Sequence, residues 1–255
     1  MEKRSLADKM AEKTFKTGAI QKSWQYHVQA FGPILTPAFP GDYQALTHLC
    51  AALNHISNRK VREGLNKLEQ VEKRCKTDAD FAALMFARGL AYDMVGDVAN
   101  MVQYYRKAGE YGHSFYLLDL KLAKAEHGAG NFAAAEADYH RAISLLEADD
   151  GDTVAHWDII LGSAYTNLAS CLTMQYRYEE AEAMLAKSKE IIAEQSGRGA
   201  TEAILYAAMG RTDKVEECIR ELEAYMPELV EPVRETTREI LEGRHPHFAP
   251  KGDDA

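Results

Sequence analysis

Apolar residues recur along most of the chain at the three- and four-residue spacing of an amphipathic helix. The first clear stripe consists of Ile20, Trp24, Val28 and Phe31. It is followed by residues 31–42, which hold three prolines and two glycines together with several apolar side chains. This composition predicts a connector that lies on the protein rather than in solvent. We therefore expect residues 1–44 to form an N-terminal helical segment with a proline-rich connector.

A longer period begins near residue 45, where small residues recur in what would be the first helix of successive hairpins. The small residues, at intervals of 37, 34, 46 and 34 residues, are Ala52, Gly89, Ala123, Ala169 and Ala203. A bulky column in the following helices consists of Leu68, Tyr105, Tyr139, Leu185 and Ile219. Two antiparallel helices approach closely where one presents a small residue and the other fills the notch. No proline occurs between residues 41 and 226, so the pattern predicts an array of helical hairpins.

These columns resemble the pattern of tetratricopeptide-repeat proteins. One repeat matches through Gly89, Tyr92, Gly96, Tyr105 and Ala108, and the next through Ala123, Gly130, Phe132, Ala135, Tyr139 and Ala142. The usual tryptophan is missing from every repeat, and Gly64 and Met101 replace a usual alanine. The resemblance implies an all-α fold: a right-handed superhelical array of antiparallel helix hairpins, with about five repeats in residues 45–227. Related helical-hairpin arrays stay open as an alternative.

Two irregular regions interrupt or end this array. The 46-residue interval places twelve extra residues around residues 147–160, either as a long loop or as a helix starting near Asp152. After Pro227, residues 228–243 read as an amphipathic capping helix that would cover the last repeat. Residues 244–255 are expected to be a frayed tail.

Charge and cysteine content narrow the classes of partner. The formal net charge of −9 argues against nucleic-acid binding, which needs a basic face. The four cysteines show no CxxC pairing, which favours reduced, partly buried thiols and a cytoplasmic setting. There is no apolar run long enough for a signal peptide at the start or for a membrane span anywhere, so no membrane partner is expected.

The sequence contains no recognisable catalytic or metal-binding pattern. It lacks a GxSxG elbow, a glycine-rich phosphate loop, HExxH and zinc-spaced cysteines. His48 and His55 are seven residues apart, and His245 and His247 flank a proline in the expected tail, so neither pair predicts a metal site. We expect no cofactor, no metal and no enzymatic activity.

A repeat array offers a concave groove lined by its first helices, and this groove is the predicted binding site. Its candidate residues, apolar at the N-terminal end and polar further on, are Leu49, Leu53, Phe86, Leu90, Met94, Leu117, Leu120, Lys124, His127 and Asn167. Such a surface suits an amphipathic helix or extended peptide. The alternative is that the leucines are inter-repeat core or are covered by residues 1–44.

The predicted function is that of a non-enzymatic scaffold that binds a protein or peptide in this groove. Some relatives of the resembled family bind chaperone tails through cationic and amide groups, but Leu49, Leu53, Tyr116 and Leu120 occupy the corresponding positions here. A chaperone-tail clamp is therefore not expected. A regulatory sensor for a small peptide or metabolite, and a self-assembling structural protein, remain alternatives.

Overall fold

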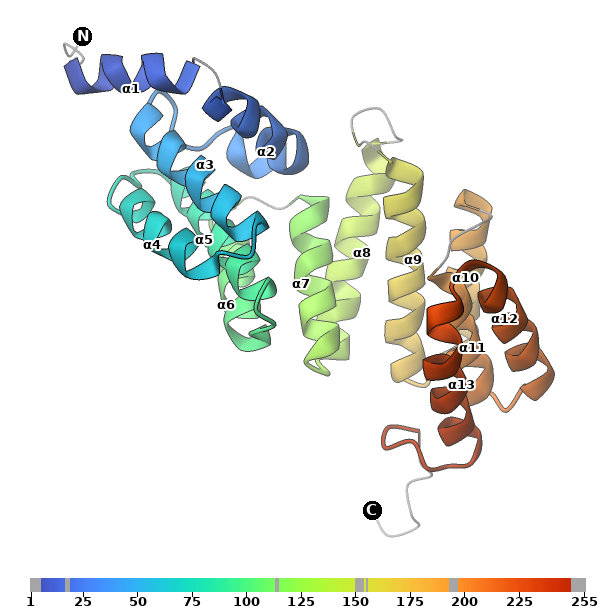
Figure 1. Cartoon of the computed structure of the whole chain (residues 1–255). Helices are drawn as coiled ribbons and strands as arrows, with labels where there is room; N and C mark the ends of the chain where they lie inside the picture. Colours follow the sequence, from blue (N-terminus) through green and yellow to red (C-terminus); the bar gives the residue numbers. More distant parts are fainter. Residues whose placement is uncertain are drawn as a thin grey trace. The chain divides into compact units, whose positions relative to one another are not determined.

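The computed structural model describes residues 6–16, 19–112, 115–149, 154, 156–192 and 197–248. Over these ranges the chain is all-helical, and it divides into two units, residues 1–129 and 130–255 (Figure 1). The helices of the first unit are α1 Leu6–Lys16, α2 Ala19–Leu35, α3 Tyr43–Ser57, α4 Val61–Glu72, α5 Asp78–Asp93, α6 Val98–Glu110 and α7 Tyr116–Gly128. Those of the second are α8 Phe132–Asp149, α9 Trp157–Met174, α10 Tyr178–Ile191, α11 Arg198–Ala208, α12 Thr212–Tyr225 and α13 Pro227–Leu241.

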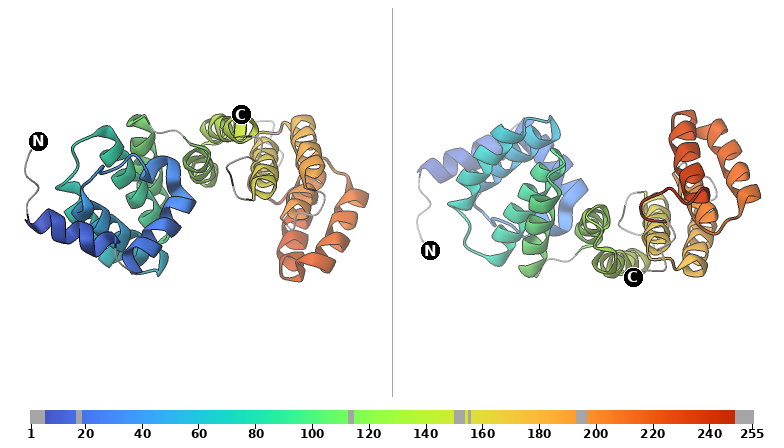
Figure 2. Two further views of the ribbon diagram at one scale, coloured as in Figure 1. Left: turned by 90° about the horizontal axis from the view of Figure 1, so that it is seen from above. Right: turned by 90° about the horizontal axis from the view of Figure 1, so that it is seen from below.

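Adjacent helices pack as antiparallel hairpins within each unit. The pairs are α3 with α4 and α5 with α6 in the first unit, and α9 with α10 and α11 with α12 in the second. Figure 2 shows many of these helices nearly end-on. The division between the units falls inside the third predicted hairpin, so α7 closes the first unit and α8 opens the second.

Each predicted hairpin has one left-handed residue at the turn between its two helices. These residues, with positive φ values between 60° and 79°, are Arg59, Gly96, Gly130, Tyr176 and Gly210. Their intervals repeat those of the small-residue column, 37, 34, 46 and 34 residues. Three of the five are glycine, the residue that adopts this conformation at the lowest cost. The turn geometry therefore confirms the predicted repeat register.

The small-residue column also works as predicted at Gly89. A Cβ atom added to Gly89 would lie 2.4 Å from Cδ1 and Cε1 of Tyr105, so the tyrosine ring fills the notch that glycine leaves. Gly64, a departure from the resembled pattern, has a similar explanation, because its Cβ would lie 2.6 Å from Cγ1 of Ile56. Both glycines mark close helix contacts rather than flexible points.

Replacing Gly89 with alanine is expected to lower the free energy of unfolding by about 2 kcal/mol, because the new methyl group overpacks the Tyr105 ring. Urea denaturation followed by circular dichroism measures this change. Gly128→Ala is the matched control, because nothing lies within 4 Å of the added Cβ at the end of α7. That control should be neutral or slightly stabilising. Equal losses in both variants would mean that the α5–α6 contact is not as tight as described.

The N-terminal segment is more helical than the sequence predicted. α2 continues past Phe31 to Leu35, with a break at Phe31, whose φ and ψ are −132° and 27°. Pro33 lacks the amide hydrogen that a continuous helix would use, which explains a break at this place. α2 packs on α3 and α5, and α1 packs on α2 and α3.

The extra residues of the 46-residue interval lengthen two helices. α8 continues to Asp149 and α9 starts at Trp157, so each spans 18 residues. The indole Nε1 of Trp157 donates to the carbonyl of Leu146 at 2.6 Å, and the Tyr165 hydroxyl donates to the Glu147 carboxylate. The predicted start near Asp152 lies outside the described residues, and the helix itself begins at Trp157.

The C-terminal residues correct the expectation of a frayed tail, at least as far as Phe248. α13 packs on α11 and α12, with Val230, Val233 and Ile240 buried against them. Beyond α13, the ring of His247 stacks on Tyr176 at a centroid distance of 5.2 Å, and its Nε2 lies 2.6 Å from the Met174 carbonyl. Residues 245–248 thus dock on the α9–α10 turn, because the rings of His247 and Phe248 both pack on the ring of Tyr176.

Candidate functional site

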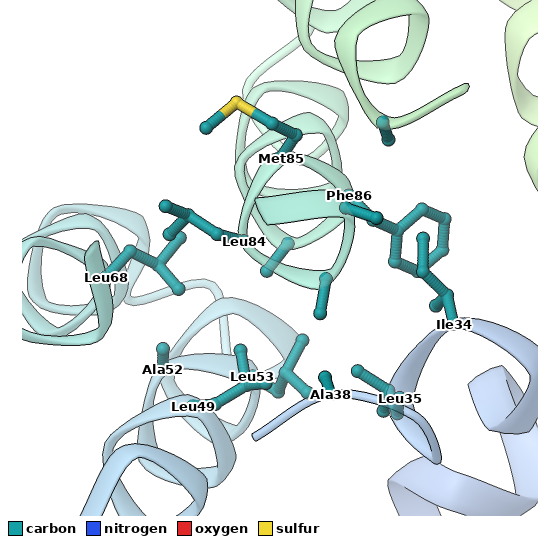
Figure 3. Close-up of a cluster of buried hydrophobic side chains, with 14 of the residues drawn as sticks. Ile34, Leu35, Ala38, Leu49, Ala52, Leu53, Leu68, Leu84, Met85 and Phe86 are labelled. Carbon is teal, nitrogen blue, oxygen red and sulfur yellow. The ribbon is translucent and has the colours of Figure 1, made fainter. Parts of the chain in front are cut away.

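The N-terminal end of the predicted groove is filled by the chain itself. Leu49, Leu53 and Phe86 are 0%, 1% and 0% exposed, so no ligand can reach them in this structure. Figure 3 shows Ile34, Leu35 and Ala38 facing these side chains from the N-terminal segment. Both interpretations left open by the sequence apply here, because these side chains are covered by residues 1–44 and also belong to the core between the hairpins, where Phe86 contacts Tyr105 and Phe115.

Aromatic contacts and hydrogen bonds hold this covering segment in place. The ring of Phe31 packs on Phe86 at a centroid distance of 5.3 Å. The buried carboxylate of Asp80 accepts hydrogen bonds from the amides of Phe39 at 2.6 Å, Lys76 at 2.9 Å and Thr77 at 3.0 Å. The guanidinium of Arg74 binds the Asp42 carboxylate, with Nε at 2.9 and 3.0 Å from its two oxygens. The sequence reasoning missed Asp80, although Thr77 followed three residues later by an acid is a capping-box signal.

The remaining candidates of the first unit lie on the C-terminal half of α5, at the residue that follows it, and on α7. We call this set the open face; it consists of Leu90, Met94, Leu117, Leu120, Lys124 and His127. The Met94 side chain is 41% exposed and Lys124 is exposed, whereas the other four are half-buried. An ion pair between Lys121 Nζ and Asp93 Oδ2, 2.6 Å apart, joins α5 to α7 beside these residues.

The open face carries one exposed cationic side chain, Lys124, and lies in a mildly basic unit. Lys124 forms no ion pair among the described residues, and burial lowers the pKa of His127, whose imidazole is neutral at pH 7. Residues 1–129 contain 18 lysines and arginines against 14 aspartates and glutamates, a net charge of +4. Residues 130–255 contain 12 against 25, a net charge of −13. The total of −9 therefore conceals a mildly basic first unit, which attracts acidic groups more than the whole-chain charge indicates.

The polar end of the predicted groove lies in the second unit, on α9. Asn167 is exposed there, with Ser163 and Ser170 half-buried. Thr166 and Thr173 are buried and use their hydroxyls internally, donating to the carbonyls of Gly162 at 3.0 Å and Ala169 at 2.8 Å. The open face and Asn167 belong to different units, so they are treated as separate surfaces.

The described residues hold no recognisable centre for metal or thiol chemistry. Among them, no group of three His, Cys, Asp or Glu side chains could hold a metal ion. All four cysteines are free, and burial raises the pKa of Cys75 and Cys218 to about 12 and of Cys171 to about 11. Such thiols are protonated at neutral pH and poor nucleophiles. None of the helices in the described ranges has the length and apolar character needed to cross a bilayer.

Comparison with known proteins identifies the fold. No protein-family model matches the chain, and no curated protein matches it at a significant level. The solved structure of YrrB, described as a tetratricopeptide-repeat protein with an unusual peptide-binding site, is similar at a TM-score of 0.58. The match covers 83% of this chain and 97% of that chain at 15% sequence identity. The chain therefore has the helical-hairpin fold of tetratricopeptide-repeat proteins.

Proposed function

We propose that the chain is a non-enzymatic scaffold that binds a protein or peptide segment on the open face of α5 and α7. The observation that supports this best is the contrast along one row of first-helix residues. The chain's own connector covers Leu49, Leu53 and Phe86, while Met94 and Lys124 stay exposed next to half-buried leucines. An apolar strip beside an unpaired ammonium group is the kind of surface that captures a peptide with apolar and acidic side chains.

Two further observations support this proposal. The fold is shared with YrrB, whose structure has a peptide-binding site, although that site belongs to YrrB and its residues are not transferred here. The four free thiols fit a reducing compartment, so we place the binding in the cytoplasm. The ligand that fits best is an extended or helical segment with apolar side chains for Leu90, Met94 and Leu120 and a carboxylate for Lys124.

The experiment is a selection of displayed random peptides on the full chain, followed by fluorescence anisotropy of the enriched peptides. Met94→Asp combined with Lys124→Glu should weaken the affinity for the selected peptides by about tenfold or more, because the double variant replaces an apolar contact and inverts a charge. Both positions are exposed, so the circular dichroism spectrum should not change.

Lys60→Glu is the matched control for the charge inversion at Lys124, because it makes the same lysine-to-glutamate change at an exposed position in the α3–α4 turn of the same unit. Its effect on affinity should stay within about twofold. Selected peptides that lack both acidic and apolar residues, or that bind the double variant as tightly as the parent chain, would overturn the proposal.

A further inference from the structure

A histidine is buried where the N-terminal helices meet the repeat helices. We call α1 together with residues 19–30 of α2 the N-terminal cover. Its contact with α3 centres on His27, which is 1% exposed. The Nε2 atom of His27 lies 3.0 Å from Oδ1 of Asn54, and the Ser23 hydroxyl donates to the same oxygen at 2.8 Å.

These contacts define the protonation state that the interface accepts. Because Asn54 Oδ1 is an acceptor, the Nε2 atom of His27 carries the hydrogen and Nδ1 carries a lone pair. Nδ1 is buried and has no hydrogen-bond partner. A proton added there would create a buried charged donor with nothing to accept its hydrogen bond, which is costly.

Among the side chains that the structure describes, the groups on the packed helices offer no compensation for such a charge. α3 contains no acidic or basic residue except His48 and His55, and its Cys50 thiol is buried with a raised pKa. On the other packed helices, Glu12 of α1 pairs with Lys16. On α5, Asp80 accepts hydrogen bonds from backbone amides, and Arg88 pairs with Glu72. Tyr26 meets the His27 ring edge-on at a centroid distance of 5.6 Å. The burial of His27 lowers its pKa, and the hydrogen bond with Asn54 offsets this in part.

A break in α2 separates the cover from the part of the segment that is locked in the core. The backbone leaves the helical conformation at Phe31, immediately after the cover. Beyond it, Ile34, Leu35 and Phe39 are at most 2% exposed, and Asp80 holds the Phe39 amide. Residues 34–39 are therefore anchored independently of His27, and Phe31 is a natural hinge between the two parts.

We propose that His27 makes the N-terminal cover an acid-sensitive latch, in which protonation of the buried ring releases residues 19–30 from α3 while residues 34–39 stay in place. The direction follows from linkage. His27 favours its neutral form in the closed state. The full free energy of closing is therefore present at pH values above the ordinary histidine pKa of about 6.5. It is lost as the pH falls from that value through the lower pKa of the closed state. Opening would uncover the α3 surface around Cys50, which is 2% exposed when the cover is closed.

The reactivity of Cys50 reports on this opening. The full chain is treated with 4,4′-dithiodipyridine, the modified cysteines are located by mass spectrometry, and each rate is divided by that of glutathione at the same pH. The normalised rate at Cys50 should rise about tenfold from about pH 7.5 to about pH 5.5. Cys171, buried in the second unit, should show no such rise.

Two variants test whether His27 is responsible. His27→Gln keeps an amide donor but does not titrate, so its Cys50 rate should lose the acid response. His48→Gln is the matched control, because this histidine lies on α3, the helix that the cover packs against, and is half-exposed; its variant should respond like the parent chain. An unchanged acid response in His27→Gln would overturn the latch, as would parallel responses at Cys50 and Cys171.

Hydrogen exchange on the unmodified chain decides the question even when His27→Gln does not fold. Acid should reduce the protection of amides in residues 19–30 before it affects α5 or α9. Equal loss of protection across α2, α5 and α9 would indicate general acid unfolding and would contradict the latch. An outcome of this kind leaves peptide binding at the open face unaffected, since that surface does not include the cover.

Discussion

Replacing Phe86 with alanine is expected to lower the free energy of unfolding of the first unit by about 3–5 kcal/mol. Phe86 is fully buried, and its ring contacts those of Phe31, Tyr105 and Phe115 at centroid distances of 5.3, 5.7 and 5.6 Å. The substitution removes the side chain on which the connector, α6 and the start of α7 all pack. The resulting cavity cannot close without moving three separate elements, so the loss should lie in the upper part of the usual range.

Urea unfolding followed by far-ultraviolet circular dichroism measures this loss, and Leu90→Ala is the matched control. Leu90 lies one helical turn further along α5 but is half-buried on the open face, so its truncation should cost about 1 kcal/mol. The sequence placed both residues in one binding groove, which would predict two mild and similar losses. Comparable values for the two variants would therefore favour the groove interpretation of Phe86 and contradict the packing described above.

The repeat architecture could be predicted from the sequence because its causes are local. The notch at Gly89 and the ring of Tyr105 that fills it are sixteen positions apart, and both recur as columns in successive hairpins. The left-handed turn residues follow the same intervals. Such features are set by contacts within one hairpin, so a periodic pattern carries them without any knowledge of the whole chain.

The proposed binding face could not be predicted to the same extent, since an apolar residue looks the same in the sequence whether a ligand or the chain itself covers it. Leu49 and Leu120 occupy comparable positions in their repeats, yet the first is buried and the second half-exposed. The difference arises from residues 31–39, which pack onto α3 and α5, two helices that lie further along the sequence. The docking of His247 on Tyr176 is likewise a contact across 71 positions, for which no periodic signal exists.

Asp80→Ala is expected to destabilise the first unit by about 3 kcal/mol, because this one buried carboxylate accepts hydrogen bonds from three backbone amides. It caps α5 through the amides of Lys76 and Thr77 and also binds the amide of Phe39 in the connector. Its own amide in turn donates to the Thr77 hydroxyl at 3.2 Å, which completes a capping box. Removal of the carboxylate leaves the Phe39 amide buried without its acceptor, a cost beyond the roughly 1 kcal/mol of an ordinary cap.

Asp78→Ala separates the connector contact from the general effect of an acid at a helix start. Asp78 is exposed in the same first turn of α5, so its loss should cost at most about 0.5 kcal/mol through the helix dipole. Hydrogen exchange adds a local test, because Asp80→Ala should reduce protection at the Phe39 amide far more than Asp78→Ala does. Equal protection of Phe39 in the two variants would mean that Asp80 acts as a helix cap alone. The connector would then be held by the burial of Ile34, Leu35 and Phe39 without help from this carboxylate.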